Sequence, residues 1–587
     1  MRDTETARET MAEREGFEPP IRCRIPDFES GAFDHSAISP QPSIIACAPA
    51  ARRGGHRRHA LLRRLQAGFA ACGAAVVLAG CATAPPGADY PREPSRALEN
   101  PAETKLGKLA AQWSAAHGGL SGFRLLPAGI DSFTLRASMA DTAERTIDAQ
   151  YFILHSDDTG RLFISRLLAA ADRGVRVRLL IDDANTIGGD GDVTKLSAHP
   201  NIEVRLFNPF RIRAGWQPLR ATELASGGYK RLSYRMHNKL MAIDNAIAVA
   251  GGRNIGDEYF AANRSFEFGD FDVFAAGPVV KRLSASFDSY WRSALAVPAE
   301  ALGRPTSEAL DGYRKQLAEH AARMADSDYV RGASERDPLG RIVKGTMPLV
   351  FAPAEVLDDS PDKEKVEDGE RDGRLLRERL LEACRAVQSE LTIVSPYLVP
   401  GTEQLAMLKA LRARGVRVRI LTNSLASTDV PVVHAGYRKY RVPLVQAGIE
   451  LYEVKPELGA PRVGRTTIQH DADGKFSLHA KVFVFDQRRV FVGSSNFDLR
   501  SLHINTEVGV MIDSPELARQ AIQRFEAITI PANSYVVKLA EHFGDPVVHW
   551  VTETDGKLVE LDKEPGHALW RELVVNAVSI LPLDDQL

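Results

Sequence analysis

Cysteine is scarce in this chain, and its placement excludes the two roles that groups of cysteines usually have. Five cysteines occur among 587 residues: Cys23, Cys47, Cys72, Cys81 and Cys384. No pair has the spacing of zinc ligands, and the set suggests no disulfide framework. Cys384 stands in the helical pattern RLLEACRAV, so we expect it to be a small buried residue.

A strong net charge is also missing. The formal net charge is −2, with 26% charged and 44% apolar residues. This balance does not imply a general polyanion-binding surface, although it is compatible with local basic patches. The length and composition are those of a globular protein with room for two or more domains.

The apolar run near the N-terminus, LQAGFAACGAAVVLAG at 65–80, is short for a membrane span. Six arginines precede it within 52–64 and Cys81 follows it, which is the order of a signal peptide. The tetrapeptide LAGC that ends at Cys81 resembles a bacterial lipobox. The resemblance implies cleavage before Cys81, lipidation of Cys81 and export. The alternative is an uncleaved membrane anchor.

An internal repeat organises the rest of the chain. RGVRVRLLIDD (173–183) recurs as RGVRVRILTNS (414–424), and each copy follows a segment with helical periodicity. Another apolar run lies upstream of each, at 146–154 and 390–399. Strand, helix and strand therefore follow one another twice, which favours an α/β sandwich.

We therefore expect two homologous α/β domains, each a mixed sheet flanked by helices, related by a pseudo-two-fold axis. The expected ranges are 118–350 for the first domain, 351–372 for a solvated acidic linker and 373–587 for the second domain. Upstream we expect a flexible tether at 81–117 and a signal peptide at 52–80. Residues 1–51 are interpreted as a disordered stretch or an extension translated from too early a start codon.

A second repeat carries chemistry. HNKLMAIDNAIAVAGGRN (237–254) and HAKVFVFDQRRVFVGSSN (479–496) each predict a β-hairpin, with turns at Asn245-Ala246 and Gln487-Arg488. Side chains two residues apart on a strand share a face, so each histidine should point the same way as its lysine. One such set is most simply a core histidine beside a surface lysine. Because two such sets occur at matched spacing, a shared functional site is the better interpretation.

If the two halves pack together, the paired motifs build a phosphate site with an acid and a base on opposite sides. The candidate residues are His237, Lys239, Asn254, His479, Lys481 and Asn496. We expect Asp244 and Asp486 to organise the hairpins rather than to act chemically. The small residues of GG and GS allow close approach of a backbone or ligand.

The pattern H-x-K-x4-D followed by G-[GS]-x-N, present twice, resembles the phospholipase D superfamily. The stretches MHNKLMAIDNAIAVAGGRNIGDEYF and GSSNFDLRS are most similar to its cardiolipin synthase C branch. The resemblance implies a covalent phosphohistidine, with one imidazole as nucleophile and the other as acid and base. The lysines and asparagines would hold the non-bridging oxygens. By this analogy His237 is favoured as nucleophile and His479 as acid and base.

The family also implies a carboxylate after each motif, which anchors an imidazole as in a Ser-His-Asp triad. Glu507 lies 28 residues past His479 (507 − 479), and Asp270 lies 33 past His237 (270 − 237). Asp272 is an alternative to Asp270. We expect no metal and no cofactor, because histidine and cysteine show no ligand clustering in the sequence.

Two further segments suggest how a substrate could be held. Residues 207–236 mix Arg211, Arg213, Arg220, Lys230, Arg231 and Arg235 with Phe207, Phe210 and Trp216. The mixture suits an anionic lipid surface, single-stranded nucleic acid or a solvated basic loop. The helical pattern HAGYRKYR, with His434, Tyr437, Arg438 and Arg441, is either a surface helix or a wall for a lipid headgroup.

The first hypothesis is a phosphatidyltransferase that makes cardiolipin from phosphatidylglycerol and a second phospholipid, such as phosphatidylethanolamine. A hydrolytic phospholipase D comes second, a nuclease third and a catalytically silent lipid-binding lipoprotein fourth. We expect a monomer that acts on membrane phospholipids and binds no nucleic acid. Its place is the periplasmic side of a membrane, inner or outer.

Overall fold

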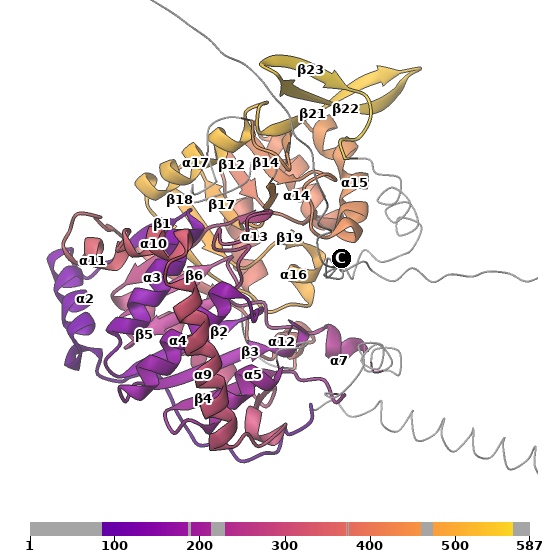
Figure 1. Cartoon of the computed structure of the whole chain (residues 1–587). Helices are drawn as coiled ribbons and strands as arrows, with labels where there is room; N and C mark the ends of the chain where they lie inside the picture. The colour runs from indigo at the N-terminus through magenta and orange to yellow at the C-terminus, as the bar shows by residue number, and fades with distance from the viewer. Residues whose placement is uncertain are drawn as a thin grey trace, which may run out of the picture. The chain divides into compact units, whose positions relative to one another are not determined.

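The computed structural model describes residues 85–185, 190–212, 223, 229–370, 373, 375–459 and 474–566. The expected extension at 1–51, the signal peptide at 52–80 and Cys81 lie outside these ranges. Within them, no helix combines the length and the apolarity that crossing a membrane requires. Two large mixed sheets, each flanked by helices, make up the described chain (Figure 1).

The first sheet has the strand order β10-β1-β8-β6-β5-β2-β3-β4-β9. Its strands are β1 (Ser121–Leu126), β2 (Thr146–Tyr151), β3 (Arg176–Asp182), β4 (Ile202–Phe207), β5 (Leu240–Ile243), β6 (Ile247–Gly251), β8 (Asp272–Ala276), β9 (Ala296–Pro298) and β10 (Val350–Ala352). Strands β2, β3 and β4 are parallel, and β5 runs antiparallel to β2.

The second sheet has the order β11-β20-β18-β17-β12-β14-β15-β21-β22-β23. Its strands are β11 (Ala354–Asp358), β12 (Glu390–Val394), β14 (Arg417–Asn423), β15 (Glu450–Val454), β17 (Val482–Phe485), β18 (Arg489–Gly493), β20 (Val508–Asp513), β21 (Ser534–His542), β22 (Asp545–Thr554) and β23 (Lys557–Leu561). The seven strands from β11 to β15 repeat the order from β1 to β4, so the expected duplication is confirmed in the fold.

Helices flank both sheets. In the first half they are α2 (Lys105–Ala116), α3 (Gly129–Thr142), α4 (Asp158–Asp172), α5 (Asp190–Lys195), α7 (Tyr229–Ser233), α8 (Pro278–Trp291), α9 (Ser307–Met324), α10 (Asp328–Ser334) and α11 (Pro338–Val343). In the second half they are α12 (Lys363–Glu367), α13 (Leu376–Arg385), α14 (Gly401–Ala413), α15 (Pro431–Gln446), α16 (Leu499–His503) and α17 (Pro515–Thr529). Short 3-10 turns occur at Pro101–Glu103, Asp183–Asn185, Leu196–Ala198 and Ala299–Ala301.

Three hydrophobic cores fill the spaces between these layers. One packs α3, α4 and α9 on the first sheet, and another packs α13, α14 and α15 on the second. The third joins the facing sides of both sheets with α8 and α17, so that Val273, Val280, Val482 and Phe525 belong to one core. Because this core is shared, the two halves are held together by apolar burial, which is the dominant favourable contribution to folding.

The halves also exchange backbone hydrogen bonds. β16 (Lys475–Leu478) pairs in parallel with β7 (Phe266–Gly269), and Met236 forms an isolated parallel bridge with Thr506. The pairing of β16 with β7 brings the segment before His479 to the first half. The bridge between Met236 and Thr506 brings the residue before His237 to the second half. The pairing therefore fixes the position of each histidine segment from the opposite half.

Two stretches differ from the expected tether and linker. In the tether, the apolar side of α2 is buried, the Trp291 indole donates to the Ser95 hydroxyl at 2.9 Å, and Asp288 accepts from the backbone of Ala97. Residues 85–117 are therefore packed on the first half rather than free.

The range 351–372 contains β11 and α12, and Asp359 and Lys363 are fully buried within it. Because this range is acidic, the sequence predicted a solvated linker and missed a strand of the second sheet and an internal ion pair. Cys384 is buried in α13, as predicted.

Candidate active site

His237 is held by Glu507 from the other half of the chain. The Nδ1 atom of His237 lies 2.9 Å from Oε2 and 3.0 Å from Oε1 of Glu507, and both residues are buried. The backbone N–H of His237 donates to the carbonyl of Thr506 at 2.9 Å. These contacts orient the ring and leave Nε2 as the nitrogen available for chemistry.

His479 has the reciprocal arrangement. Its Nδ1 lies 2.6 Å from Oδ2 of Asp270, and its backbone N–H donates to the carbonyl of Gly269 at 2.8 Å. Each carboxylate follows the motif of its own half in sequence, as predicted, but anchors the histidine of the other half. The alternative, Asp272, instead pairs with Arg136 at 3.0 Å and Arg253 at 3.4 Å.

The two imidazoles share one electrostatic environment. Burial lowers the pKa of both histidines well below the usual value, and the charges of Lys239 and Lys481 lower it further. The charge of His237 also contributes to lowering the pKa of His479. Both rings are therefore neutral near pH 7 in the free protein.

Lys239 and Lys481 lie beside these rings and are fully buried. The Lys239 ammonium donates to the carbonyl of His237 at 2.7 Å, and that of Lys481 lies 2.8 Å from Nδ1 of His479. Burial lowers the pKa of Lys481 to about 8 and that of Lys239 well below its usual value. Two buried cations that also repel each other favour an anionic ligand.

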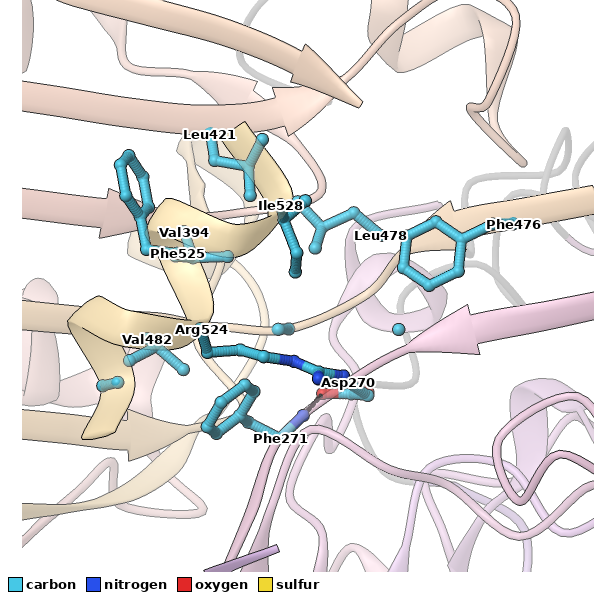
Figure 2. A pocket seen from close by; sticks show the side chains of 13 residues that line it. Asp270, Phe271, Val394, Leu421, Phe476, Leu478, Val482, Arg524, Phe525 and Ile528 are labelled. Atoms are coloured by element: carbon cyan, nitrogen blue, oxygen red, sulfur yellow. Dashed lines mark hydrogen bonds between the residues drawn. The ribbon is translucent and has the colours of Figure 1, made fainter. Parts of the chain in front are cut away.

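The anchoring carboxylates are shifted in the opposite direction. Burial raises the pKa of Glu507 to about 7, and it also raises the pKa of Asp270. A small cavity of about 20 Å³ lies behind Asp270, lined mainly by apolar side chains of both halves and by Arg524 of α17 (Figure 2). This apolar surrounding accounts for the cost of charging Asp270.

The asparagines of the two motifs are used differently. The Asn254 amide accepts from the backbone N–H of Ile153 at 3.1 Å and donates to the Tyr259 hydroxyl at 3.0 Å. In the described residues, the buried amide oxygen of Asn496 has no hydrogen-bond partner. Asn254 thus helps to build the wall of the site, whereas Asn496 keeps an unpaired acceptor oxygen among the described residues.

The motif aspartates organise the hairpins, as predicted. Asp244 accepts from the backbone N–H groups of residues 144–146, and Asp486 from those of residues 388–390. The predicted two-residue turns are one residue short: the loops span 244–246 and 486–488, and the positive φ angles fall on Asp244-Asn245 and Asp486-Gln487. Aspartate tolerates this conformation, so the turns begin at the aspartates themselves.

The small residues after each hairpin behave differently in the two halves. A Cβ atom at Gly252 would collide with the Asp270 carboxylate. At the equivalent position Ser494 donates its hydroxyl to Glu507. Close approach, which the sequence predicted, is confirmed at Gly252.

Asp359 and Lys363, which the sequence hid in an acidic stretch, support the loop that carries Glu507. Lys363 donates to Asp359 at 3.0 Å and to the carbonyls of Ser501 at 2.9 Å and Asn505 at 2.7 Å. Asp359 accepts from the backbone N–H of Glu507 at 3.1 Å. The four-residue spacing of Asp359 and Lys363 was the available signal.

The segment HAGYRKYR is neither a surface helix nor an open headgroup wall. His434, Tyr437 and Arg441 are buried in α15. His434 lies 2.7 Å from Glu564, while Tyr437 and Arg441 each lie 2.7 Å from Glu453. Their charge and hydrogen bonds are therefore used inside the second half.

In the basic segment 207–236, three of the described cations have acidic partners. Arg231 pairs with Glu223 at 2.7 Å, Arg235 with Asp182 at 3.3 Å and Lys230 with Glu364 at 2.5 Å. Arg213, Trp216 and Arg220 lie outside the described residues, so the idea that this segment contacts lipid stays a prediction.

A cluster of potential metal ligands lies after β2, although the sequence showed no such clustering. The ligand atoms of His155, Asp157 and Glu258 are within 4.8 Å of one another. Asp157 already accepts from the backbone N–H of Gly160 at 2.9 Å and of Asp257 at 2.8 Å, which caps α4. These bonds give the carboxylate a structural role.

Known proteins share this arrangement of motifs. The family described as "Cardiolipin synthase, PLD-like domain" matches residues 137–291 and 380–529. Cardiolipin synthase C of Escherichia coli K12 is 40% identical over 485 residues, which cover 82% of this chain and 99% of that protein. An uncharacterized protein of Helicobacter pylori 26695 is 31% identical and covers 82% and 93%.

Among solved structures, phosphatidylserine synthase of Haemophilus influenzae matches 81% of this chain and 100% of its own, with 13% identity and a TM-score of 0.48. The sequence matches extend over both halves and include both histidine motifs. The chain therefore belongs to the family of cardiolipin synthases with phospholipase D-like domains.

Proposed function

We propose that this protein is a phosphatidyltransferase that joins two phospholipids into cardiolipin through a covalent phosphohistidine. The observation that carries the proposal is the crossed anchoring: Glu507 holds His237 and Asp270 holds His479. Two oriented, neutral imidazoles beside two buried lysines suit a phosphodiester. The family membership supports cardiolipin as the product.

In the first step, Nε2 of His237 attacks the phosphorus of the donor lipid. A P–N bond forms and the P–O bond to the headgroup breaks, while His479 gives its proton to the leaving alcohol. Because the free site keeps His479 neutral, the proton must be taken up when substrate binds. The phosphate charge favours this uptake, since an anion beside an imidazole raises its pKa.

In the second step, a hydroxyl of the acceptor lipid attacks the phosphohistidine. His479 takes the proton of that hydroxyl, the new P–O bond forms, and the P–N bond breaks to restore His237. The ammonium groups of Lys239 and Lys481 and the side-chain N–H of Asn496 stabilise the charge on the non-bridging oxygens. The assignment of His237 as nucleophile follows the family resemblance.

The experiment offers purified protein vesicles of phosphatidylglycerol, with and without phosphatidylethanolamine. Cardiolipin with release of glycerol or ethanolamine supports the proposal, and the released alcohol identifies the donor. Phosphatidic acid as the sole lipid product would show that water is the acceptor and would overturn the transferase assignment.

We also propose that the mature chain begins at Cys81 and is attached by lipid to the periplasmic side of a membrane. The arginine-rich stretch, the short apolar run and LAGC support this. Two or more acyl chains give stable anchoring. Labelled palmitate should enter the wild-type protein but not Cys81→Ser. Equal labelling of both would remove the anchor.

A further inference from the structure

The carboxylate of Asp429 precedes helix α15 in the second half, and the mechanism above does not use it. Asp429 is exposed and precedes α15, and it accepts a hydrogen bond from the Tyr397 hydroxyl at 2.8 Å. The charge of Asp429 contributes to raising the pKa of Lys481. Tyr397 directly precedes β13 (Leu398–Val399), whose Leu398 pairs with Phe497, the residue after Asn496, so the Tyr397–Asp429 pair lies beside the second motif.

Hydrogen bonds place the loop that leads to Asp429 on the His479 side of the site: Asn423 donates to the carbonyl of Leu478 and accepts from its N–H, both at 2.9 Å, and Leu478 precedes His479. The charge of Asp429 also acts on Tyr259, whose ring packs against His479 with centroids 5.2 Å apart. Tyr259 in turn accepts a hydrogen bond from Asn254. On the other side, the ring of Phe152 packs against His237 at 5.0 Å. The carboxylate and the acid-base histidine therefore share one flank.

The sign of this charge is opposite to what phosphate binding needs. A carboxylate repels a phosphodiester, but it accepts hydrogen bonds strongly from a hydroxyl or an ammonium group. A role limited to the start of α15 fits less well, because Asp429 lies outside the first turn and Val430 is the N-cap. The group that a carboxylate suits beside an acid-base histidine is an alcohol.

We propose that Asp429 and Tyr397 form the subsite for the acceptor alcohol, a diol headgroup such as the glycerol of phosphatidylglycerol. One hydroxyl of the diol donates to the Asp429 carboxylate, and the neighbouring hydroxyl is thereby directed at phosphorus, within reach of His479. No proton passes to Asp429. This inference rests on the proposed function. It adds the contacts by which a lipid alcohol is bound as the acceptor in preference to water.

The first test measures the ratio of cardiolipin to phosphatidic acid formed from phosphatidylglycerol vesicles. Asp429→Ala and Tyr397→Phe should lower this ratio, Asp429→Ala by about tenfold, which is the effect of losing one hydrogen bond to a charged group. Asp429→Asn keeps the shape and should lower the ratio less. Glu403→Ala, which removes a surface carboxylate that pairs with Arg385, is the matched control.

The second test uses phosphatidylethanolamine vesicles with small alcohols as acceptors. The wild-type protein should prefer free glycerol or propane-1,2-diol to propan-1-ol, and Asp429→Ala should lose this preference. If free glycerol is no better than propan-1-ol but phosphatidylglycerol remains a good acceptor, recognition belongs to the lipid part, and the diol subsite is overturned.

The remaining outcomes are equally decisive. A purely structural residue would lower both lipid products together and leave the ratio unchanged, which would overturn the subsite. If Asp429→Ala fails to fold, Asp429→Asn and Tyr397→Phe decide. Slower ethanolamine release with an unchanged ratio would assign the carboxylate to an ammonium headgroup. Wild-type protein that makes phosphatidic acid alone would remove the proposed function, and the subsite with it.

Discussion

The two halves of the chain repeat one motif and one strand order, yet they support their anchoring carboxylates differently. In the first half, Arg253 donates to the carbonyl of Asp270, and Asp272 ties Arg253 to Arg136. In the second half, Ser494 donates directly to the Glu507 carboxylate, and Asp359 accepts from the Glu507 backbone. Arg253 therefore supports the segment of Asp270 in the first half. In the second half Lys363 supports the segment of Glu507 by pairing with Asp359.

This difference teaches that duplication preserved the contacts at phosphorus more strictly than the scaffold behind them. Each histidine contacts one carboxylate from the other half and one lysine from its own half: Lys239 donates to the backbone carbonyl of His237, and Lys481 lies beside the ring of His479. The Asn254 amide is engaged by Tyr259 and Ile153, whereas the Asn496 oxygen is open in the described chain. The halves are therefore free to take unequal roles in the reaction.

The largest effect is expected from removing either imidazole. His237→Ala and His479→Ala should each lower turnover at least about a thousandfold, because a covalent path needs both groups. Rapid quenching with mass spectrometry should find a peptide that carries the phosphatidyl group on His237 in His479→Ala and none in His237→Ala. His199→Gln, which removes a histidine paired with Asp172, should stay within about twofold.

A phosphatidyl group found on His479 instead would make His479 the nucleophile and His237 the acid and base, within the same two-step mechanism. Full turnover in either alanine variant would show that the half concerned does not take part in the chemistry.

The crossed anchoring predicts how the carboxylates differ. Asp270→Asn and Glu507→Gln should each lower turnover about a hundredfold or more, as the loss of an orienting carboxylate does in hydrolytic triads. A phosphatidyl ester of p-nitrophenol needs no protonation of its leaving group. Release of nitrophenol in the first turnover should therefore recover in Asp270→Asn, which acts through the acid His479.

The same ester should not rescue Glu507→Gln, because that variant impairs the nucleophile His237. Rescue of Glu507→Gln instead of Asp270→Asn would mean that each carboxylate serves the histidine of its own half.

A smaller effect on activity, but a large one on stability, is expected from Lys363→Met. The change leaves Asp359 charged and buried without its partner, which should lower the free energy of unfolding by about 3–5 kcal/mol. Asp359→Asn combined with Lys363→Met should recover part of the loss. Chemical denaturation measures both. If both variants are as stable as wild type, the buried pair does not hold the Glu507 loop.

The sequence predicted the repeated parts of this comparison and missed the parts that arise from packing. The duplicated sheets and the hairpins follow from apolar periodicity and equal spacing, which are local. Asp270 and Glu507 are implied by the family resemblance and lie at unequal distances from their motif histidines. The exchange of carboxylates between halves depends on how the halves dock. No residue pattern within one half, such as that from His237 to Asp270, encodes it.

Burial explains the other differences. Asp359 and Lys363 look solvated in an acidic stretch, and His434 and Arg441 look like a surface helix, because charged residues usually lie outside. In the structure Asp359 pairs with Lys363 and Arg441 pairs with Glu453, while His434 lies 2.7 Å from the Glu564 carboxylate. Such pairs become visible only when the elements that bring them together are in place.

The smallest expected effect concerns pH, and it tests whether the lysines are also unequal. Burial lowers the pKa of Lys481 to about 8, so its ammonium loses a proton, and with it the charge that binds phosphate, as the pH rises through that value. The value of kcat/KM should therefore fall above about pH 8. In Lys481→Arg, whose guanidinium stays protonated, the basic limb of the profile should move upward even if the rate falls several-fold. The matched variant Lys239→Arg shows which lysine titrates. If the basic limb moves upward in Lys239→Arg but not in Lys481→Arg, the titrating cation is Lys239 of the first half.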